Sequence, residues 1–279
     1  MTVTTLFTPR SADEAVDLMR RHGSDLVVLA GGTIMMPMIN DGALFPRQVM
    51  SLRRAGLDGL HTANDHVEIG ATANLARVAE VNALPPLAEA ARTVGGPALR
   101  TMATIGGNLF AHPPHGDLGA PLLALDAEVQ LAGGRVLALE DFYAERASGS
   151  RAGTELVTAL RVPRPQGQSV YLKCGRRQGN TTSVIAVAVQ VMIGSDGTCS
   201  DARIALGAAA SHPMRARRAE EQLRGRLPDG EICAAAAEEA MAECEPFTDA
   251  IASDWYRRKM IGVYVRRALE ATLSIHVGQ

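Results

Sequence analysis

The chain has 279 residues, of which 47% are hydrophobic, and it carries 28 basic and 30 acidic side chains. This length predicts about two domains with a substantial core, and the near balance of charge argues against a nucleic-acid or membrane-surface binder, which would need a basic excess. The longest apolar runs are too short to cross a bilayer, and the N-terminus lacks the basic and apolar segments of a signal peptide.

The cysteines indicate a protein without an intrinsic metal cluster. They are Cys174, Cys199, Cys233 and Cys244, and none forms a Cys-x-x-Cys pair. This spacing argues against an iron–sulfur cluster or a structural zinc within the chain. Reduced thiols in the cytoplasm are the default interpretation.

The first part of the chain is predicted to alternate helices and short strands. Ser11 and Glu14 form a capping box that begins a helix, and this helix ends at Gly23. A buried strand is expected over residues 25–30, and it leads directly into Gly31 and Gly32. Further along, we expect a strand at residues 67–70 and helices at 75–81 and 86–94.

Turn signals divide the middle of the chain. The segment 112–117 contains adjacent prolines and cannot be a regular helix. A hairpin is predicted from residues 129–132 and 136–139 around a Gly-Gly pair. Residues 147–153 are small and are expected to be flexible. A strand is then predicted at 155–162.

The pattern changes after residues 163–168, which are the best candidate for a linker. Three strands are expected next, at residues 169–174, 183–193 and 202–207. Three helices are expected after them, at residues 214–223, 231–243 and 253–273. Strands and helices do not alternate as regular βαβ units. The sequence therefore predicts an α+β protein whose smaller C-terminal part is an antiparallel sheet carrying helices.

Two Gly-Gly motifs stand out, each beside an apolar run and with a hydroxyl residue. The first is Leu-Ala-Gly-Gly-Thr at residues 29–33, and the second is Ala-Thr-Ile-Gly-Gly-Asn at residues 103–108. Glycine reaches positive φ and has no Cβ, so successive N–H groups can converge into an anion-binding nest. One such motif is most often a tight turn. Two in one chain predict a ligand with a long phosphate bridge that is gripped from two sides.

The common nucleotide motifs and hydrolase motifs do not account for these glycines. No Gly-x-Gly-x-x-Gly follows a strand, and no Gly-Lys dipeptide is present. The chain also has no Gly-x-Ser-x-Gly elbow and no His-Glu-x-x-His. The chemistry is therefore expected to belong to a bound cofactor, with the protein supplying position and electrostatics.

Taken together, the motifs make the chain similar to the FAD-binding medium subunit of the molybdenum hydroxylases, the flavoprotein family of xanthine dehydrogenase and carbon monoxide dehydrogenase. The likeness spans nearly the whole chain. It rests on residues 29–33, 69–71, 103–108 with Asp117, Glu155, Pro163, 173–177, 207–209, 213–215, 219–220 and 253–257.

This resemblance implies a fold with two domains. Residues 1–168 would form a two-part FAD-binding domain of the PCMH/vanillyl-alcohol-oxidase-like type, with two α/β subdomains split near residue 57. Residues 169–279 would form the C-terminal flavoprotein domain.

The resemblance also implies which residues hold FAD. Residues 29–36 would wrap the pyrophosphate, residues 104–108 would form the second wall, and Asp117 would hold flavin or ribityl hydroxyls. Val157 would pack near the isoalloxazine, and Lys173 would lie by the flavin ring, where a cation favours the reduced anionic form. The implied cofactor-binding residues are Leu29, Ala30, Gly31, Gly32, Thr33, Ile34, Met35, Met36, Thr104, Ile105, Gly106, Gly107, Asn108, Asp117, Val157 and Lys173.

Simpler interpretations of these residues stay open. Lys173 could form a surface ion pair, and Asp117 could cap a loop. His112 and His115 could bind a metal, but no carboxylate or cysteine cluster lies near them in the sequence, so we predict no metal site. The arginines of residues 215–218 are expected to form a solvated helix face, with an acidic partner subunit as the alternative.

The function implied by the resemblance is electron transfer. A large subunit with molybdopterin would hydroxylate the substrate, and a small subunit with two [2Fe-2S] clusters would pass electrons to FAD in this chain. FAD would then reduce an external acceptor, which could be NAD, a quinone, a cytochrome or dioxygen. The assembly would be a heterotrimer, often doubled to a dimer of heterotrimers.

Three alternatives remain. One is a self-sufficient flavin oxidoreductase that acts directly on an organic substrate, which would need its own substrate pocket and a proton donor near the flavin. Another is a binding or scaffolding subunit that has lost FAD. The third is a nucleotide-binding regulator, which would prefer ATP to FAD.

Overall fold

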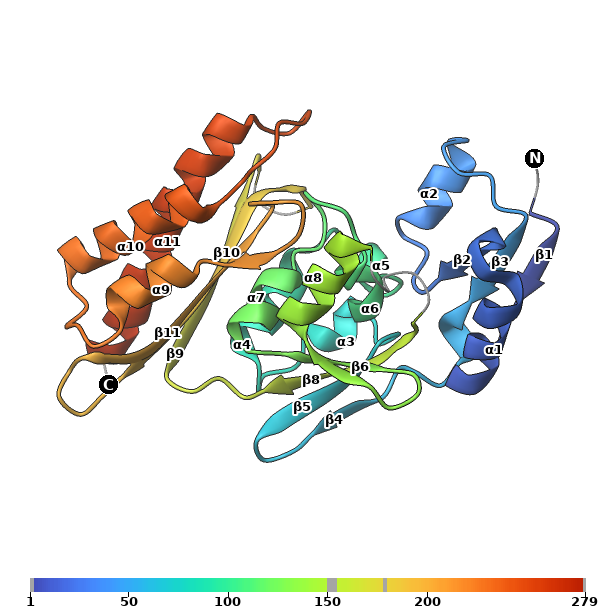
Figure 1. The fold of residues 1–279 in the computed structure, drawn as a ribbon, viewed down its shortest axis with the longest axis horizontal. Helices are drawn as coiled ribbons and strands as arrows, with labels where there is room; N and C mark the ends of the chain where they lie inside the picture. The colour runs from blue at the N-terminus through green and yellow to red at the C-terminus, as the bar shows by residue number, and fades with distance from the viewer. Residues whose placement is uncertain (1–2, 150–154, 178–179, 278–279) are drawn as a thin grey trace.

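The computed structural model describes residues 3–149, 155–177 and 180–277, which form three sheets with attached helices (Figure 1). An N-terminal lobe, a middle part and a C-terminal part follow one another along the longest axis of the molecule. The sheets have three, five and four strands in that order.

The N-terminal lobe is built on a parallel sheet in the order β1-β3-β2. The Ser11 hydroxyl accepts from the Glu14 N–H at 3.2 Å, which confirms the predicted N-cap, but the Glu14 carboxylate bonds the N–H of Arg10 at 2.7 Å. The elements are β1 (Thr5–Phe7), α1 (Ala12–His22), η1 (Gly23–Asp25), β2 (Leu26–Leu29), α2 (Met35–Asn40), β3 (Gln48–Ser51) and η2 (Leu52–Arg54).

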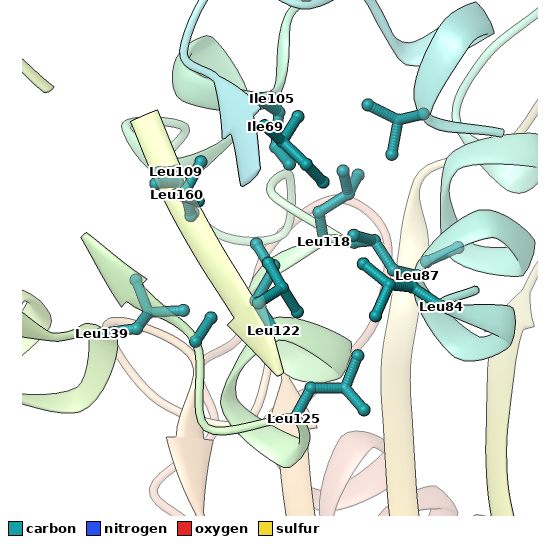
Figure 2. Packing of buried hydrophobic residues seen from close by; sticks show 14 of the residues in the cluster. Ile69, Leu84, Leu87, Ile105, Leu109, Leu118, Leu122, Leu125, Leu139 and Leu160 are labelled. Atoms are coloured by element: carbon teal, nitrogen blue, oxygen red, sulfur yellow. The ribbon is translucent and has the colours of Figure 1, made fainter. Parts of the chain in front are cut away.

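The middle part has an antiparallel sheet in the order β4-β5-β8-β6-β7. Its side chains pack with those of the helices into one apolar cluster (Figure 2). The elements are β4 (Leu60–Thr62), β5 (His66–Gly70), α3 (Leu75–Val78), α4 (Pro85–Thr93), α5 (Pro97–Arg100), α6 (Ile105–Leu109), α7 (Gly119–Ala124), β6 (Glu128–Leu131), β7 (Val136–Ala138), α8 (Leu139–Ser148) and β8 (Val157–Pro163).

The C-terminal part is an antiparallel sheet in the order β12-β11-β10-β9, with three helices on the face that points away from the middle part (Figure 1). The predicted class, α+β with a C-terminal antiparallel sheet and helices, is confirmed. The elements are β9 (Gln168–Gly175), β10 (Ser183–Ile193), β11 (Cys199–Gly207), β12 (Met214–Arg215), α9 (Arg217–Leu223), α10 (Gly230–Glu243) and α11 (Asp254–Val277).

Strand β10 joins two cores, because alternate side chains of a strand point to opposite faces. Ile185 and Val187 belong to the apolar cluster of the C-terminal part, on the side that contacts α11, whereas Ala186 and Ala188 belong to the cluster of the middle part. The small side chains on the second face let α7 approach closely. A Cβ added to Gly207 of β11 would lie 3.7 Å from the Ala120 Cβ of α7. The C-terminal sheet therefore packs directly against the middle part.

Two local predictions are wrong. The helix expected over residues 214–223 begins only at Arg217, because residues 214–215 pair with β11 as strand β12. The expected solvated face of residues 215–218 fails at Arg215, whose side chain is 3% exposed and lies 2.8 Å from an Asp126 carboxylate oxygen, with Glu220 as a second partner. Arg217 and Arg218 of α9 have half-exposed side chains, as expected. A buried guanidinium needs such partners to offset its desolvation.

The predicted hairpin around Gly133 and Gly134 is confirmed, with φ of 92° and 86° at the two glycines. Its second strand is shorter than expected, because Leu139 begins helix α8. This helix also includes the first residues of the segment predicted to be flexible, and residues 150–153 of that segment lie outside the described residues.

A candidate cofactor site between the glycine motifs and the C-terminal sheet

The first Gly-Gly motif forms an open loop after strand β2. Gly32 has φ of 74°, which L side chains rarely adopt, and its carbonyl accepts from the Met36 N–H at 2.9 Å. Within the residues that the structure describes, the N–H groups of residues 31–34 donate to no protein acceptor. Exposed apolar side chains flank the loop at Ile34 and Met36. The loop therefore offers free backbone donors next to a nonpolar surface.

The two motifs lie side by side although about 70 residues separate them. A Cβ added to Gly31 would lie 2.1 Å from the Met102 carbonyl oxygen, so Gly31 is in backbone contact with the start of the second motif. A Cβ added to Gly107 would lie 3.8 Å from the Ala30 Cβ. The absence of side chains at these glycines permits this approach.

The second motif differs from the first in its hydrogen bonds. Ile105 and Gly106 donate to the carbonyls of Ala73 and Ala71 at 3.0 and 2.8 Å, Gly107 donates to the Thr104 hydroxyl at 3.1 Å, and Asn108 donates to the Thr104 carbonyl at 3.0 Å.

Residues 105–108 therefore have no free N–H group, and neither glycine of this motif has positive φ. The prediction of a second anion-binding nest is wrong. This segment is instead the capped first turn of α6, and Gly106 allows close packing, since its Cβ would lie 2.7 Å from the Ala71 carbonyl oxygen.

Asn108 connects the second motif to Asp117. Its side-chain oxygen accepts from the Leu118 N–H at 3.0 Å, which fixes the loop that carries Asp117. The Asp117 carboxylate pairs with Lys173 of strand β9 at 2.6 Å, and both side chains are less than one-tenth exposed. The Lys173 ammonium also donates to the Thr93 carbonyl at 3.2 Å. Lys173 is thus in a buried ion pair, and the alternative of a surface pair is wrong.

Asp117 has a second partner from the C-terminal part. The Ser183 hydroxyl of β10 donates to its other carboxylate oxygen. Burial, and then the negative charge of Asp117, raise the pKa of Tyr171 well above its ordinary value.

The structure brings together most of the predicted site residues. A continuous series of contacts runs from the N-terminal lobe to the C-terminal sheet, through residues 29–36, residues 104–108, Asp117 and Lys173. Val157 is an exception, because it is 3% exposed and belongs to the apolar cluster of the middle part. Thr93 and Ser183 were missed, since no local pattern marks a residue whose partner is distant in the sequence.

The described residues show neither a metal-binding cluster nor a membrane-spanning helix. They contain no group of three His, Cys, Asp or Glu side chains that could hold a metal ion. No described helix has the length and apolar character required to span a membrane.

The chain matches known flavoproteins along nearly its whole length. Residues 2–165 match the family described as the FAD binding domain in molybdopterin dehydrogenase, and residues 170–272 match the CO dehydrogenase flavoprotein C-terminal domain. The carbon monoxide dehydrogenase medium chain of Afipia carboxidovorans is 33% identical over 272 residues, which is 94% of each chain. The nicotine 6-hydroxylase medium subunit of Paenarthrobacter nicotinovorans is 30% identical and also covers 94% of each chain.

Solved structures agree with these relatives. The carbon monoxide dehydrogenase from Hydrogenophaga pseudoflava which lacks the Mo-pyranopterin moiety of the molybdenum cofactor superimposes with a TM-score of 0.89 at 30% identity, over 98% of each chain. Matched family domains, relatives above 30% identity and this superposition all give the same result. The chain belongs to the FAD-binding medium subunits of the molybdenum hydroxylase family, and it is an electron-transfer subunit of an oxidoreductase.

Proposed function

We propose that FAD binds along the contact surface of the two glycine motifs and extends to the buried Asp117–Lys173 pair. The free N–H groups of residues 31–34 carry this proposal, because they are hydrogen-bond donors with no acceptor in the described chain. A diphosphate oxygen would satisfy them, and convergent backbone donors are a common means of binding phosphates. The donor set therefore fits the group.

Each segment of the site would have a separate role. Residues 29–36 would bind the pyrophosphate, and residues 104–108 would form a rigid wall, since their own donors are used internally. The exposed side chains of Ile34, Met36 and Met102 give planar rings a nonpolar surface. Asp117 keeps acceptor capacity for hydroxyl or ring N–H groups.

Lys173 would place a positive charge at the far end of the site. It is almost completely buried, where a charge acts more strongly than in water. Bound FAD would supply the redox chemistry, accepting electrons and passing them on. The chain's own contribution is to hold the cofactor and set the field around it.

The substrate is proposed to be determined by a different subunit. Relatives of similar identity are medium subunits of enzymes named for carbon monoxide and for nicotine. Another relative, 28% identical, is the glyceraldehyde dehydrogenase medium chain of Sulfolobus acidocaldarius. Medium chains of one fold thus occur with unrelated substrates. We infer partners with molybdopterin and with [2Fe-2S] clusters, assembled as a dimer of heterotrimers in the cytoplasm, where four free and buried thiols would stay reduced.

Titration of the full chain with FAD tests this proposal, with the quenching of flavin fluorescence as the readout. We expect tight binding by the wild type and much weaker binding by Gly32→Ala, because alanine disfavours the φ of 74° that shapes the loop. Gly56→Ala is the matched control, since Gly56 has φ of 71° and its Cβ would meet nothing within 4 Å. Failure of the wild type to bind FAD, or equal loss in both variants, would overturn the assignment.

A further inference from the structure

Strand β10 has an irregularity next to the candidate site. Ser183 pairs with Gly175 and Ile185 pairs with Cys174, so Val184 is an extra residue on β10. An extra residue of this kind interrupts the ladder and redirects neighbouring side chains. Here it lies beside Ser183, whose hydroxyl bonds Asp117. The direction of the Ser183 side chain therefore depends on the local shape of the strand.

Arg257 of helix α11 holds this irregularity from the opposite side of the sheet. Its guanidinium donates to the Ser183 carbonyl at 3.5 Å and also to the Val184 carbonyl. The bulged backbone carbonyls thus receive donors from a side chain. Arg257 is completely buried, pairs with Asp249 at 2.7 Å, and lies 4.5 Å from the centre of the Phe247 ring.

The arrangement connects the C-terminal helix to the cofactor site in a fixed order. Asp249 pairs with Arg257, Arg257 holds the backbone of Ser183, and Ser183 bonds the carboxylate of Asp117 opposite Lys173. A buried guanidinium costs much free energy unless it is fully paired. One terminal nitrogen of Arg257 donates to the Ser183 and Val184 carbonyls of β10 and the other to Asp249, whereas its buried Nε has no hydrogen-bond partner.

We propose that Arg257 is a positioning residue for FAD binding, which acts by holding the bulge of β10 so that the Ser183 hydroxyl fixes the Asp117 carboxylate. This inference rests on the proposed function, because it assumes that Asp117 contacts the cofactor. Arg257 itself touches neither Asp117 nor the loop of residues 31–34.

FAD affinity of full-length variants tests the inference, with circular dichroism as the check on folding. The variants are Asp117→Asn, Ser183→Ala and Arg257→Gln. We expect each to weaken FAD binding by about tenfold, the scale of one lost hydrogen bond to a charged group. Arg258→Gln is the matched control, because Arg258 is the next residue of α11 and donates to the Met241 carbonyl, away from the site. It should change the affinity by less than about twofold.

Coupling distinguishes positioning from a general structural role. In the Asp117→Asn background, Ser183→Ala and Arg257→Gln should each lower FAD affinity by less than about a further twofold, because both act through the Asp117 carboxylate, which that background lacks. Replacing a purely structural residue would lower FAD affinity by the same factor in both backgrounds, and that result would overturn the inference.

If Arg257→Gln does not fold, Ser183→Ala provides the test, and unchanged FAD affinity in that variant would reject the proposed positioning role. Failure of the wild-type chain to bind FAD would reject the proposed function and this inference with it. Normal binding by the wild type and by Asp117→Asn would reject only the role of Asp117 and what depends on it.

Discussion

In the first Gly-Gly motif, Gly32 adopts φ of 74° and the N–H groups of residues 31–34 have no acceptor in the described chain, whereas in the second motif residues 105–108 all donate to protein oxygens. The glycines of the first motif are needed for backbone shape and for close approach to Met102. Those of the second are needed only because a Cβ would not fit.

This difference shows that two similar sequences can use glycine for different physical reasons. In the proposed site, the loop with free donors would bind FAD, while the capped helix turn would present a rigid surface to it. The contrast predicts that changes in the first motif act mainly on cofactor affinity and changes in the second mainly on folding stability. Four measurements test this contrast and the site around it.

The largest effect is expected for Gly31→Ala. Its Cβ would lie 2.1 Å from the Met102 carbonyl oxygen and 2.9 Å from the Ala103 Cα, so the two motifs would have to separate. We expect FAD affinity to fall by about 100-fold, measured by fluorescence titration. Gly96→Ala is the control, because a Cβ there meets nothing within 4 Å. Unchanged affinity in Gly31→Ala would contradict the contact between the motifs.

Gly106→Ala should act on stability. The added Cβ would lie 2.7 Å from the Ala71 carbonyl oxygen, inside the packed middle part. We expect the free energy of unfolding to fall by about 1–3 kcal/mol in urea titrations. A variant with normal stability but lost FAD affinity would indicate that the second motif binds the cofactor through its backbone after all.

Thr104→Ala removes the N-cap of helix α6. The Thr104 hydroxyl accepts from the Gly107 N–H, so its loss should cost about 1 kcal/mol of unfolding free energy. Thr104→Ser keeps the acceptor and should retain most of the stability. Thermal and urea denaturation of both variants check this prediction. Equal losses in the two variants would mean that the methyl group, and not the cap, is what matters.

The smallest effect is expected for the pH dependence of stability that arises from Asp249, the partner of Arg257. Burial acts to raise the pKa of Asp249, but hydrogen bonds from the Ala252 N–H and from Arg257 outweigh it and hold the pKa below the ordinary 3.8. The stability that this carboxylate contributes is therefore present above pH 3.8 and is lost as the pH falls through the lower folded-state pKa.

Urea unfolding at a series of acidic pH values measures this dependence. Asp249→Asn should lack the part of the decline below pH 3.8 that the carboxylate causes. An identical acid profile in the variant and the wild type would show that the Asp249–Arg257 pair contributes nothing to the folded state.

Local patterns predicted much of the fold. The mostly apolar segment 183–193 is strand β10, and the Gly133–Gly134 pair is a hairpin turn. The expected helix at 231–243 differs from α10 by one residue at its start. Short elements were less accessible. Strands β1 and β12 have three and two residues and exist through pairing with other strands, which periodicity does not report.

The family and the positions of the two glycine motifs can be recognised without coordinates, because residue types at fixed local spacing carry them. Only the tertiary structure decided which motif keeps free donors, that Lys173 pairs with Asp117 from 56 positions away, and that Arg257 reaches the bulge beside Ser183. These properties depend on which distant atoms fill the hydrogen-bonding capacity of a group. Burial then makes each such pairing decisive, since a buried polar group without a partner is costly.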